Sequence, residues 1–210
     1  TVKGLMQVLK IGKIATYYGL TEASRSTFMV FDDKIRRYNS VGLPPSNIEI
    51  KINSKEGFGQ VGEICIKGQN VIESYWKNIE MDRNIVNGWL RTSDVGHLDD
   101  HGYLFLDGRI DDMINIGGEK VIPSEIEVIV NELKGIEEVV VLGSPHDTFG
   151  QIVKLFAKKS KDSEITKTEI IGHCVKRLER YKVPTIIEFV DEFPRTEYGK
   201  IKRYELKDLG

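Results

Sequence analysis

Five short segments carry the side chains in this chain that are best suited to chemistry. The first reads Tyr18-Gly19-Leu20-Thr21-Glu22 and follows an apolar stretch. Gly19 allows a tight turn, Tyr18 can lie against a purine face, and Thr21 can offer a hydroxyl to a phosphate. Glu22 supplies a hard oxygen ligand of the kind that Mg²⁺ prefers. By themselves, these residues also fit a plain strand-to-turn junction with a solvated glutamate.

The next two segments contain Asp94 and Arg109. Asp94 ends an apolar strand, where a carboxylate can accept hydrogen bonds from two ribose hydroxyls. Arg109 follows Gly108 and presents a permanently charged, rigid fork of donors. In isolation, Asp94 also fits a residue that caps a turn. Arg109 also fits a surface ion pair with a nearby aspartate, which contributes little to stability.

The last two segments are Gly117-Gly118-Glu119-Lys120 and a loop that ends in Gly199-Lys200. Paired glycines carry a conformational cost, so either a close ligand or a β-turn must require them. A lysine beside a glycine can reach into a cleft and neutralise charge that develops between a carboxylate and a phosphate. Among 30 lysines and arginines, however, the default interpretation of any one lysine is a surface residue.

In this order the five segments resemble the late motifs of the adenylate-forming enzymes: acyl-CoA synthetases, luciferases and the adenylation domains of peptide synthetases. Such enzymes activate a carboxylic acid with ATP as an acyl-AMP and then pass the acyl group to a thiol. The resemblance covers essentially the whole chain. The family's Gly-rich Ser/Thr loop ending in lysine, which cradles the ATP phosphates, is not found in these 210 residues. We therefore expect the C-terminal portion of a larger enzyme, inactive alone.

The resemblance implies a role for each segment. Glu22 would hold Mg²⁺, and Asp94 would bind the ribose. Ser93 stands where the family often has glycine, and its small size predicts little effect. The nucleotide-binding residues would be Tyr18, Gly19, Thr21, Asp94 and Arg109, with Tyr18 against adenine, Thr21 on the α-phosphate, and Arg109 on the ribose and phosphate.

The remaining implied roles belong to the second half of the chain. Lys200 would be the catalytic lysine of adenylation, and Asp111 would be the hinge about which a small domain turns between the two half-reactions. Gly118 and Lys120 would lie in a loop that swings to the active site for thioester formation and lines the pantetheine tunnel. The stretch from Gly118 to Glu127 is more similar to acyl-CoA synthetases than to peptide-synthetase domains.

The first half of the chain shows the alternation of apolar and polar residues that is typical of strands. Turn-forming residues separate these stretches and favour a barrel or a small sheet. Strands are expected at 14–18, 47–52, 62–67, 89–92 and 103–106.

The second half is expected to follow the order α-β-β-α-β. An apolar stripe through Ile126 and Val130 predicts a helix over 121–133, and Thr166 and Glu169 have the form of a capping box before a second helix. Strands are expected at 139–142, 152–157 and 186–190.

We place the domain boundary at Gly108–Asp112. Residues 1–110 would be the C-terminal part of the large AMP-binding domain, an α/β domain that ends in a β-rich, barrel-like subdomain. Residues 111–210 would be the small, mobile α+β domain.

Composition limits the partners and the location. The net charge of −2, with both signs interspersed, argues against nucleic acid as a general partner. No apolar run approaches the roughly 20 residues that a membrane span needs. Two cysteines, Cys65 and Cys174, fit a reduced cytoplasmic protein better than a disulfide scaffold, and both are expected to be buried.

The leading hypothesis is an AMP-forming acid–CoA ligase that uses ATP, Mg²⁺ and CoA. One alternative is a ligase that loads a carrier protein instead of free CoA. Another is a non-catalytic nucleotide-binding or interaction domain, which the presence of Glu22, Asp94 and Lys200 disfavours. The sequence specifies neither the acid nor the oligomeric state.

Overall fold

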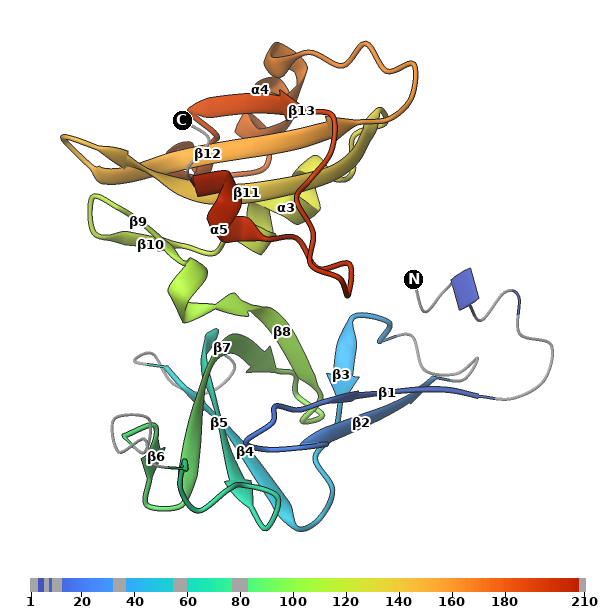
Figure 1. Cartoon of the computed structure of the whole chain (residues 1–210), viewed down its shortest axis with the longest axis vertical. Helices are drawn as coiled ribbons and strands as arrows, with labels where there is room; N and C mark the ends of the chain where they lie inside the picture. Colours follow the sequence, from blue (N-terminus) through green and yellow to red (C-terminus); the bar gives the residue numbers. More distant parts are fainter. Residues whose placement is uncertain are drawn as a thin grey trace. The chain divides into compact units, whose positions relative to one another are not determined.

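The computed structural model describes residues 4, 5, 8, 13–31, 37–54, 60–76 and 83–207. The chain divides into two compact units, Thr1–Ile110 and Asp111–Gly210 (Figure 1). The first unit consists mainly of strands, and the second packs helices on a sheet. This mixed α/β and α+β architecture is the fold class expected from the sequence.

The first unit contains two antiparallel sheets. Strands β1 (Ile14–Tyr18) and β2 (Thr27–Phe31) form the smaller one. The larger follows the path β3-β8-β7-β5-β4, and β6 pairs with β7. Its strands are β3 (Ser40–Gly42), β4 (Ile48–Asn53), β5 (Gly62–Gly68), β6 (Ile85–Val86), β7 (Trp89–Leu98) and β8 (Leu104–Arg109).

The larger sheet is open rather than closed into a barrel. Within the described residues, β3 and β4 are the two ends of the path and do not pair with each other. The alternation that predicted β4 is confirmed, because Ile48 is buried against Ile64, Ile66 and Leu90 in one apolar core. The alternating pattern therefore predicted the strands of the sheet, but it did not reveal whether the sheet closes into a barrel.

The second unit is a five-stranded sheet in the order β10-β9-β12-β11, with β13 parallel to β12. The strands are β9 (Ile114–Ile116), β10 (Glu119–Val121), β11 (Ile136–His146), β12 (Gly150–Lys159) and β13 (Ile186–Val190). The α-helices are α3 (Pro123–Val130), α4 (Lys167–Val175) and α5 (Arg203–Lys207), with short 3₁₀ turns at Ile110–Asp112 and Arg180–Lys182.

The sheet of the second unit is covered on both faces. Ile126 of α3 and Ile170 of α4 are fully buried with Val141 and Leu155 of the sheet. On the opposite face Leu206 of α5 packs with Leu142, Phe156 and Phe193. The predicted order α-β-β-α-β lacked the hairpin β9–β10 before it and α5 after it.

Local signals explain where the second unit's helices begin. Pro123 starts α3, and residue 121 belongs to β10 instead of to the helix. The Thr166 hydroxyl accepts from the Glu169 N–H, and the Glu169 carboxylate accepts from the Thr166 N–H at 2.9 Å. This capping box confirms the predicted start of α4.

Two further features concern the cysteines and the helices. Cys65 and Cys174 are both buried and unpaired with each other, and burial raises the pKa of each thiol. Among the described helices, none has the length and apolar character needed to cross a bilayer.

Candidate functional site

The buried carboxylate of Asp94 is the centre of the candidate site in the first unit. Its Oδ2 accepts a hydrogen bond of 2.7 Å from the Tyr18 hydroxyl, and its Oδ1 accepts one of 2.8 Å from Arg109. Asp94 lies directly opposite Arg109 in the β7–β8 ladder, which accounts for that pair. Burial, followed by the hydrogen bond to Asp94, raises the pKa of the Tyr18 phenol. The hydroxyl therefore remains a donor at every physiological pH.

A β-bulge in β7 directs Asp94 toward these partners. Cys65 of β5 lies opposite Arg91, whereas Glu63 lies opposite Val95, so Thr92, Ser93 and Asp94 together face one residue of β5. The Thr92 hydroxyl makes two hydrogen bonds to backbone groups at the bulge. It donates to the Ile64 carbonyl at 2.8 Å and accepts from the Asp94 N–H at 3.0 Å. Bulges of this kind re-aim a side chain at functional sites.

Ser93 occupies the strained position of the bulge. Its φ of +60° lies in the left-handed region, where a Cβ is unfavourable and glycine is preferred. The small size of serine, on which the sequence-based expectation depended, is therefore not the relevant property. The relevant property is the backbone conformation, which the pattern of the strand could not reveal.

The loop after β1 folds back on Gly19. The Ser26 N–H donates to the Tyr18 carbonyl at 2.7 Å. A Cβ at Gly19 would lie 2.5 Å from the Arg25 nitrogen and 2.8 Å from the Ala23 oxygen. Glycine is thus required at this position by the close approach of the returning backbone, rather than by a positive φ.

The same loop presents the residues predicted for phosphate and metal. Thr21 is exposed, and Glu22 is half-buried. The Tyr75 hydroxyl donates to Glu22 Oε1 at 3.2 Å. In the described part of the chain, no group of three or more His, Cys, Asp and Glu side chains could hold a metal. A single carboxylate is sufficient for Mg²⁺ when phosphates and water complete the shell, so Glu22 fits that role.

In the second unit, the glycine pair forms the turn of the β9–β10 hairpin. Gly117 and Gly118 have φ of +61° and +99°, as the tightest two-residue hairpin turns require. The Gly118 N–H donates to Asn115 Oδ1 at 3.1 Å. A Cβ at Gly118 would meet nothing within 4 Å. The turn alone therefore accounts for both glycines, and it leaves them and Lys120 exposed.

Lys200 lies in a separate loop that is closed by backbone hydrogen bonds. The Thr196 N–H donates to the Lys200 carbonyl at 2.8 Å, and Arg195 forms a bridge with Ile201. Arg195 also donates to the Gly199 carbonyl at 2.9 Å and pairs with Glu138 of β11. The Lys200 side chain is exposed, and no residue in the described ranges pairs with it.

The structure joins only some of the predicted residues directly. Tyr18, Asp94 and Arg109 share hydrogen bonds, and Gly19, Thr21 and Glu22 continue from Tyr18 in one loop. Asp111 lies in the 3₁₀ turn that begins the second unit. Lys200 and the Gly118 turn belong to two different loops of that unit. Thr92 and Tyr75 were missed because their partners lie 28 and 53 residues away in sequence.

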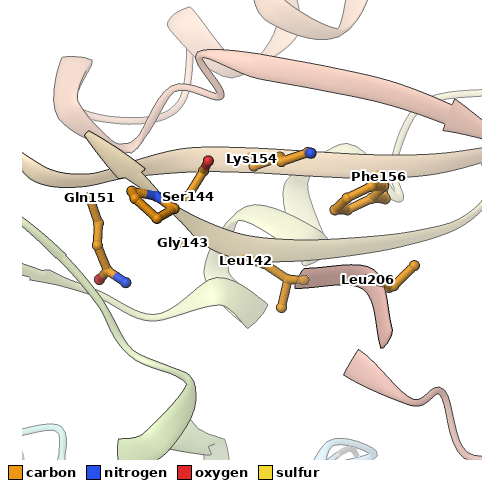
Figure 2. Close-up of a pocket in the computed structure, with 8 residues that line it drawn as sticks. Leu142, Gly143, Ser144, Gln151, Lys154, Phe156 and Leu206 are labelled. Carbon is orange, nitrogen blue, oxygen red and sulfur yellow. The ribbon is translucent and has the colours of Figure 1, made fainter. Parts of the chain in front are cut away.

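A pocket of about 230 Å³ in the second unit contains none of the predicted site residues (Figure 2). Leu142, Phe156 and Leu206 form its apolar part. Lys154 also lines it. The Lys154 ammonium lies 2.9 Å from Glu188 and 4.8 Å from the Phe156 ring centre, so its charge is already compensated within the unit.

A buried aspartate on a bulged strand, a loop that carries Glu22 and a following α+β unit fit the adenylate-forming class that the sequence motifs indicated. The comparisons with known proteins agree. The AMP-binding enzyme model matches residues 1–76, and the model of the AMP-binding enzyme C-terminal domain matches residues 125–200. The chain belongs to the family of AMP-binding, adenylate-forming enzymes.

Relatives in this family include CoA ligases. A long-chain-fatty-acid–CoA ligase of Escherichia coli is 38% identical over 196 residues, which are 91% of this chain and 35% of the ligase. ATP-bound MatB from Rhodopseudomonas palustris has a TM-score of 0.86 at 28% identity, covering 93% of this chain and 41% of MatB.

A Bacillus subtilis o-succinylbenzoate CoA synthetase, solved with its acyl-adenylate intermediate, has a TM-score of 0.81 at 30% identity and covers 93% of this chain and 41% of the synthetase. The chain thus spans well under half the length of these relatives.

The strain at Ser93 gives a stability prediction. Ser93→Gly should be more stable than Ser93→Ala by about 1 kcal/mol, because only glycine adopts φ of +60° without the Cβ penalty. Urea denaturation of both variants, followed by circular dichroism, measures the difference. Equal stabilities, or a more stable alanine variant, would show that the bulge carries no such strain.

Proposed function

We propose that this chain is part of a longer ATP-dependent acid–CoA ligase. The enzyme would activate a carboxylic acid as acyl-AMP and transfer the acyl group to the thiol of CoA. The observation that carries this proposal is the buried Asp94 carboxylate held by Tyr18 and Arg109, next to the loop with Thr21 and Glu22. The related proteins include CoA ligases, and this supports CoA as the thiol that accepts the acyl group.

The geometry of Asp94 suits a ribose. An ionised carboxylate offers about four acceptor positions, and Tyr18 and Arg109 each use one. Both oxygens therefore keep capacity for the two ribose hydroxyls. Arg109 has five N–H donors, and its side chain is nearly half exposed, so it can also reach a phosphate. The exposed Thr21 hydroxyl would contact the α-phosphate.

Glu22 would hold the Mg²⁺ that accompanies ATP. When bound, the ion neutralises negative charge on the phosphates. The loop itself positions the two side chains. Its tight return on Gly19 holds Thr21 and Glu22 at a fixed spacing.

The first half-reaction is an in-line displacement. A carboxylate oxygen of the acid attacks the α-phosphorus, an O–P bond forms, and pyrophosphate leaves with the electrons of the broken P–O bond. We place the Lys200 ammonium where charge develops between the acid and the α-phosphate. Its side chain is exposed and has no partner among the described residues, on a loop fixed by Arg195, and this supports the role.

The second half-reaction is acyl transfer. The CoA sulfur attacks the acyl carbon, a C–S bond forms, AMP leaves with the electrons of the C–O bond, and the thiol proton passes to solvent. We assign the Gly118 turn and Lys120 to the pantetheine arm. The open space at Gly118 supports this assignment, since an added Cβ there would meet no described atom within 4 Å and a ligand could approach the backbone closely.

The two half-reactions need different groups near the reacting atoms. We propose that the second unit turns about Asp111 between them. Asp111 is exposed and lies at the boundary between the two units. A short segment at such a boundary is where hinge rotations are usually absorbed.

The central prediction of this function concerns Asp94. In the full-length protein, acid-dependent exchange of pyrophosphate into ATP should occur, followed by CoA thioester formation. Asp94→Asn should lower kcat/KM for ATP by about tenfold to a hundredfold, since hydrogen bonds to a charged group contribute about 1.5–3 kcal/mol each. Wild-type exchange without any effect of Asp94→Asn would exclude the proposed ribose site. No exchange with any acid in the wild type would exclude the ligase itself.

A second prediction separates the half-reactions through Lys200. Lys200→Ala should slow acyl-AMP formation by about 10²–10³, the loss typical of one transition-state contact. Transfer from preformed acyl-AMP to CoA should stay within a few-fold of wild type. Single-turnover assays of each step give both rates, and Lys202→Ala in the same stretch serves as the control. Equal losses in both steps would remove Lys200 from the adenylation role.

The opposite selectivity is expected at the hairpin turn. Gly118→Leu should leave acyl-AMP formation within a few-fold of wild type and sharply raise the KM for CoA, because a bulky side chain would obstruct the thiol arm. Since φ of +99° strains any residue with a Cβ, a melting curve must first show that the variant folds. Lys120→Ala tests the same hairpin, from β10, without that strain.

Normal CoA kinetics in both turn variants would show that the turn is structural. If Lys200→Ala and the turn variants affected the same half-reaction, rotation about Asp111 would lose its support.

A further inference from the structure

The loop that carries Glu22 is braced by a segment roughly 50 residues later in sequence. The Ile72 N–H donates to the Glu22 carbonyl at 2.9 Å, and Ala23 forms an antiparallel bridge with Val71. Ala23 is completely buried. The backbone on both sides of the Glu22 side chain is therefore fixed against the segment that follows β5.

Asn70 extends the brace to the far side of the same loop. Its amide nitrogen donates to the Ser24 carbonyl and to the Ser26 hydroxyl, each at 3.0 Å. The Ser26 hydroxyl itself donates to the Ala23 carbonyl at 2.9 Å and is fully buried. The loop is thus held by side chains as well as by backbone bonds, and its position depends on residues 70–72.

Tyr75 completes the brace at the functional side chain. Its hydroxyl donates to Glu22 Oε1 at 3.2 Å, whereas no described residue donates to Glu22 Oε2. One oxygen is therefore oriented by the protein, and the other points away from that bond. A carboxylate fixed in this way offers a single, directed oxygen, which suits Mg²⁺ because that ion demands near-ideal octahedral geometry.

We propose that Tyr75 is a positioning residue, which holds the Glu22 carboxylate so that Oε2 meets the metal of the bound metal–ATP complex. The inference rests on the proposed function, because it assumes that Glu22 is a metal ligand. In this proposal Tyr75 acts on the metal through Glu22. Loss of its hydroxyl should therefore weaken metal binding without slowing the reaction when metal is saturating.

The test uses the full-length protein with Tyr75→Phe, which keeps the aromatic ring and removes only the donor. Mn²⁺ serves as a probe, with a non-hydrolysable ATP analogue, and free Mn²⁺ is measured by electron paramagnetic resonance. Tyr75→Phe should raise the Kd for Mn²⁺ about tenfold, in line with the loss of one hydrogen bond to a charged group. In turnover, the Mg²⁺ concentration for half-maximal rate should rise similarly while kcat at saturating Mg²⁺ stays within about twofold.

Two variants make the outcome decisive. Tyr17→Phe removes a hydroxyl from a tyrosine of β1 that is 62% exposed, and it should change neither value. Glu22→Gln should raise the Mn²⁺ Kd at least as much as Tyr75→Phe. The double variant should then be no weaker than Glu22→Gln alone, because Tyr75 acts through Glu22.

The possible failures are distinguishable. An effect of Glu22→Gln without one of Tyr75→Phe would overturn the positioning role and leave the metal role of Glu22 intact. An effect of Tyr75→Phe that adds fully to that of Glu22→Gln would show that Tyr75 acts elsewhere. No effect of either variant would remove Glu22 from the metal site, and the inference would fail with it. A lower kcat at an unchanged Mn²⁺ Kd would mark Tyr75 as merely structural.

Discussion

The hydrogen bond between the Tyr18 hydroxyl and the Asp94 carboxylate is the interaction on which the candidate site depends. It joins two strands from different sheets across 76 residues of sequence, and both partners are buried. A hydrogen bond to a charged group contributes about 1.5–3 kcal/mol, and both Tyr18 and Arg109 donate such a bond to Asp94. Tyr18 is buried together with Asp94, whereas the Arg109 side chain is nearly half exposed and competes with solvent for the same carboxylate.

This arrangement is possible only because β7 is irregular. In a regular strand, alternate residues face opposite sides of the sheet. The bulge places Thr92, Asp94 and Val95 all in the interior, and the Thr92 hydroxyl satisfies the backbone groups that the bulge disrupts. The bulge also forces the backbone of Ser93 into the left-handed region, which is unfavourable for a residue with a Cβ. Backbone strain of this kind recurs at functional sites, where the surrounding structure holds it in place.

The sequence predicted the regular elements well for physical reasons that can be named. The alternating isoleucines of β4 and the capping box of α4 are local signals, and both are confirmed. Strand β2 was missed because Phe28 and Val30 are apolar but exposed, so the stretch shows no alternation. The hairpin β9–β10 was one of two explanations for the glycine pair, because φ is not visible in a sequence. Contacts between distant residues, such as Tyr75 with Glu22, left no local pattern at all.

The site residues were named from their order along the chain and from the resemblance of their motifs. The structure adds the physical links among Tyr18, Asp94 and Arg109, but the roles of these residues toward a nucleotide remain proposals. The most direct test is a crystal structure of the full-length protein with a non-hydrolysable acyl-adenylate analogue. The account predicts both ribose hydroxyls within about 3 Å of the Asp94 carboxylate oxygens, with the Tyr18 hydrogen bond retained. An adenylate bound with its ribose away from Asp94 would contradict it.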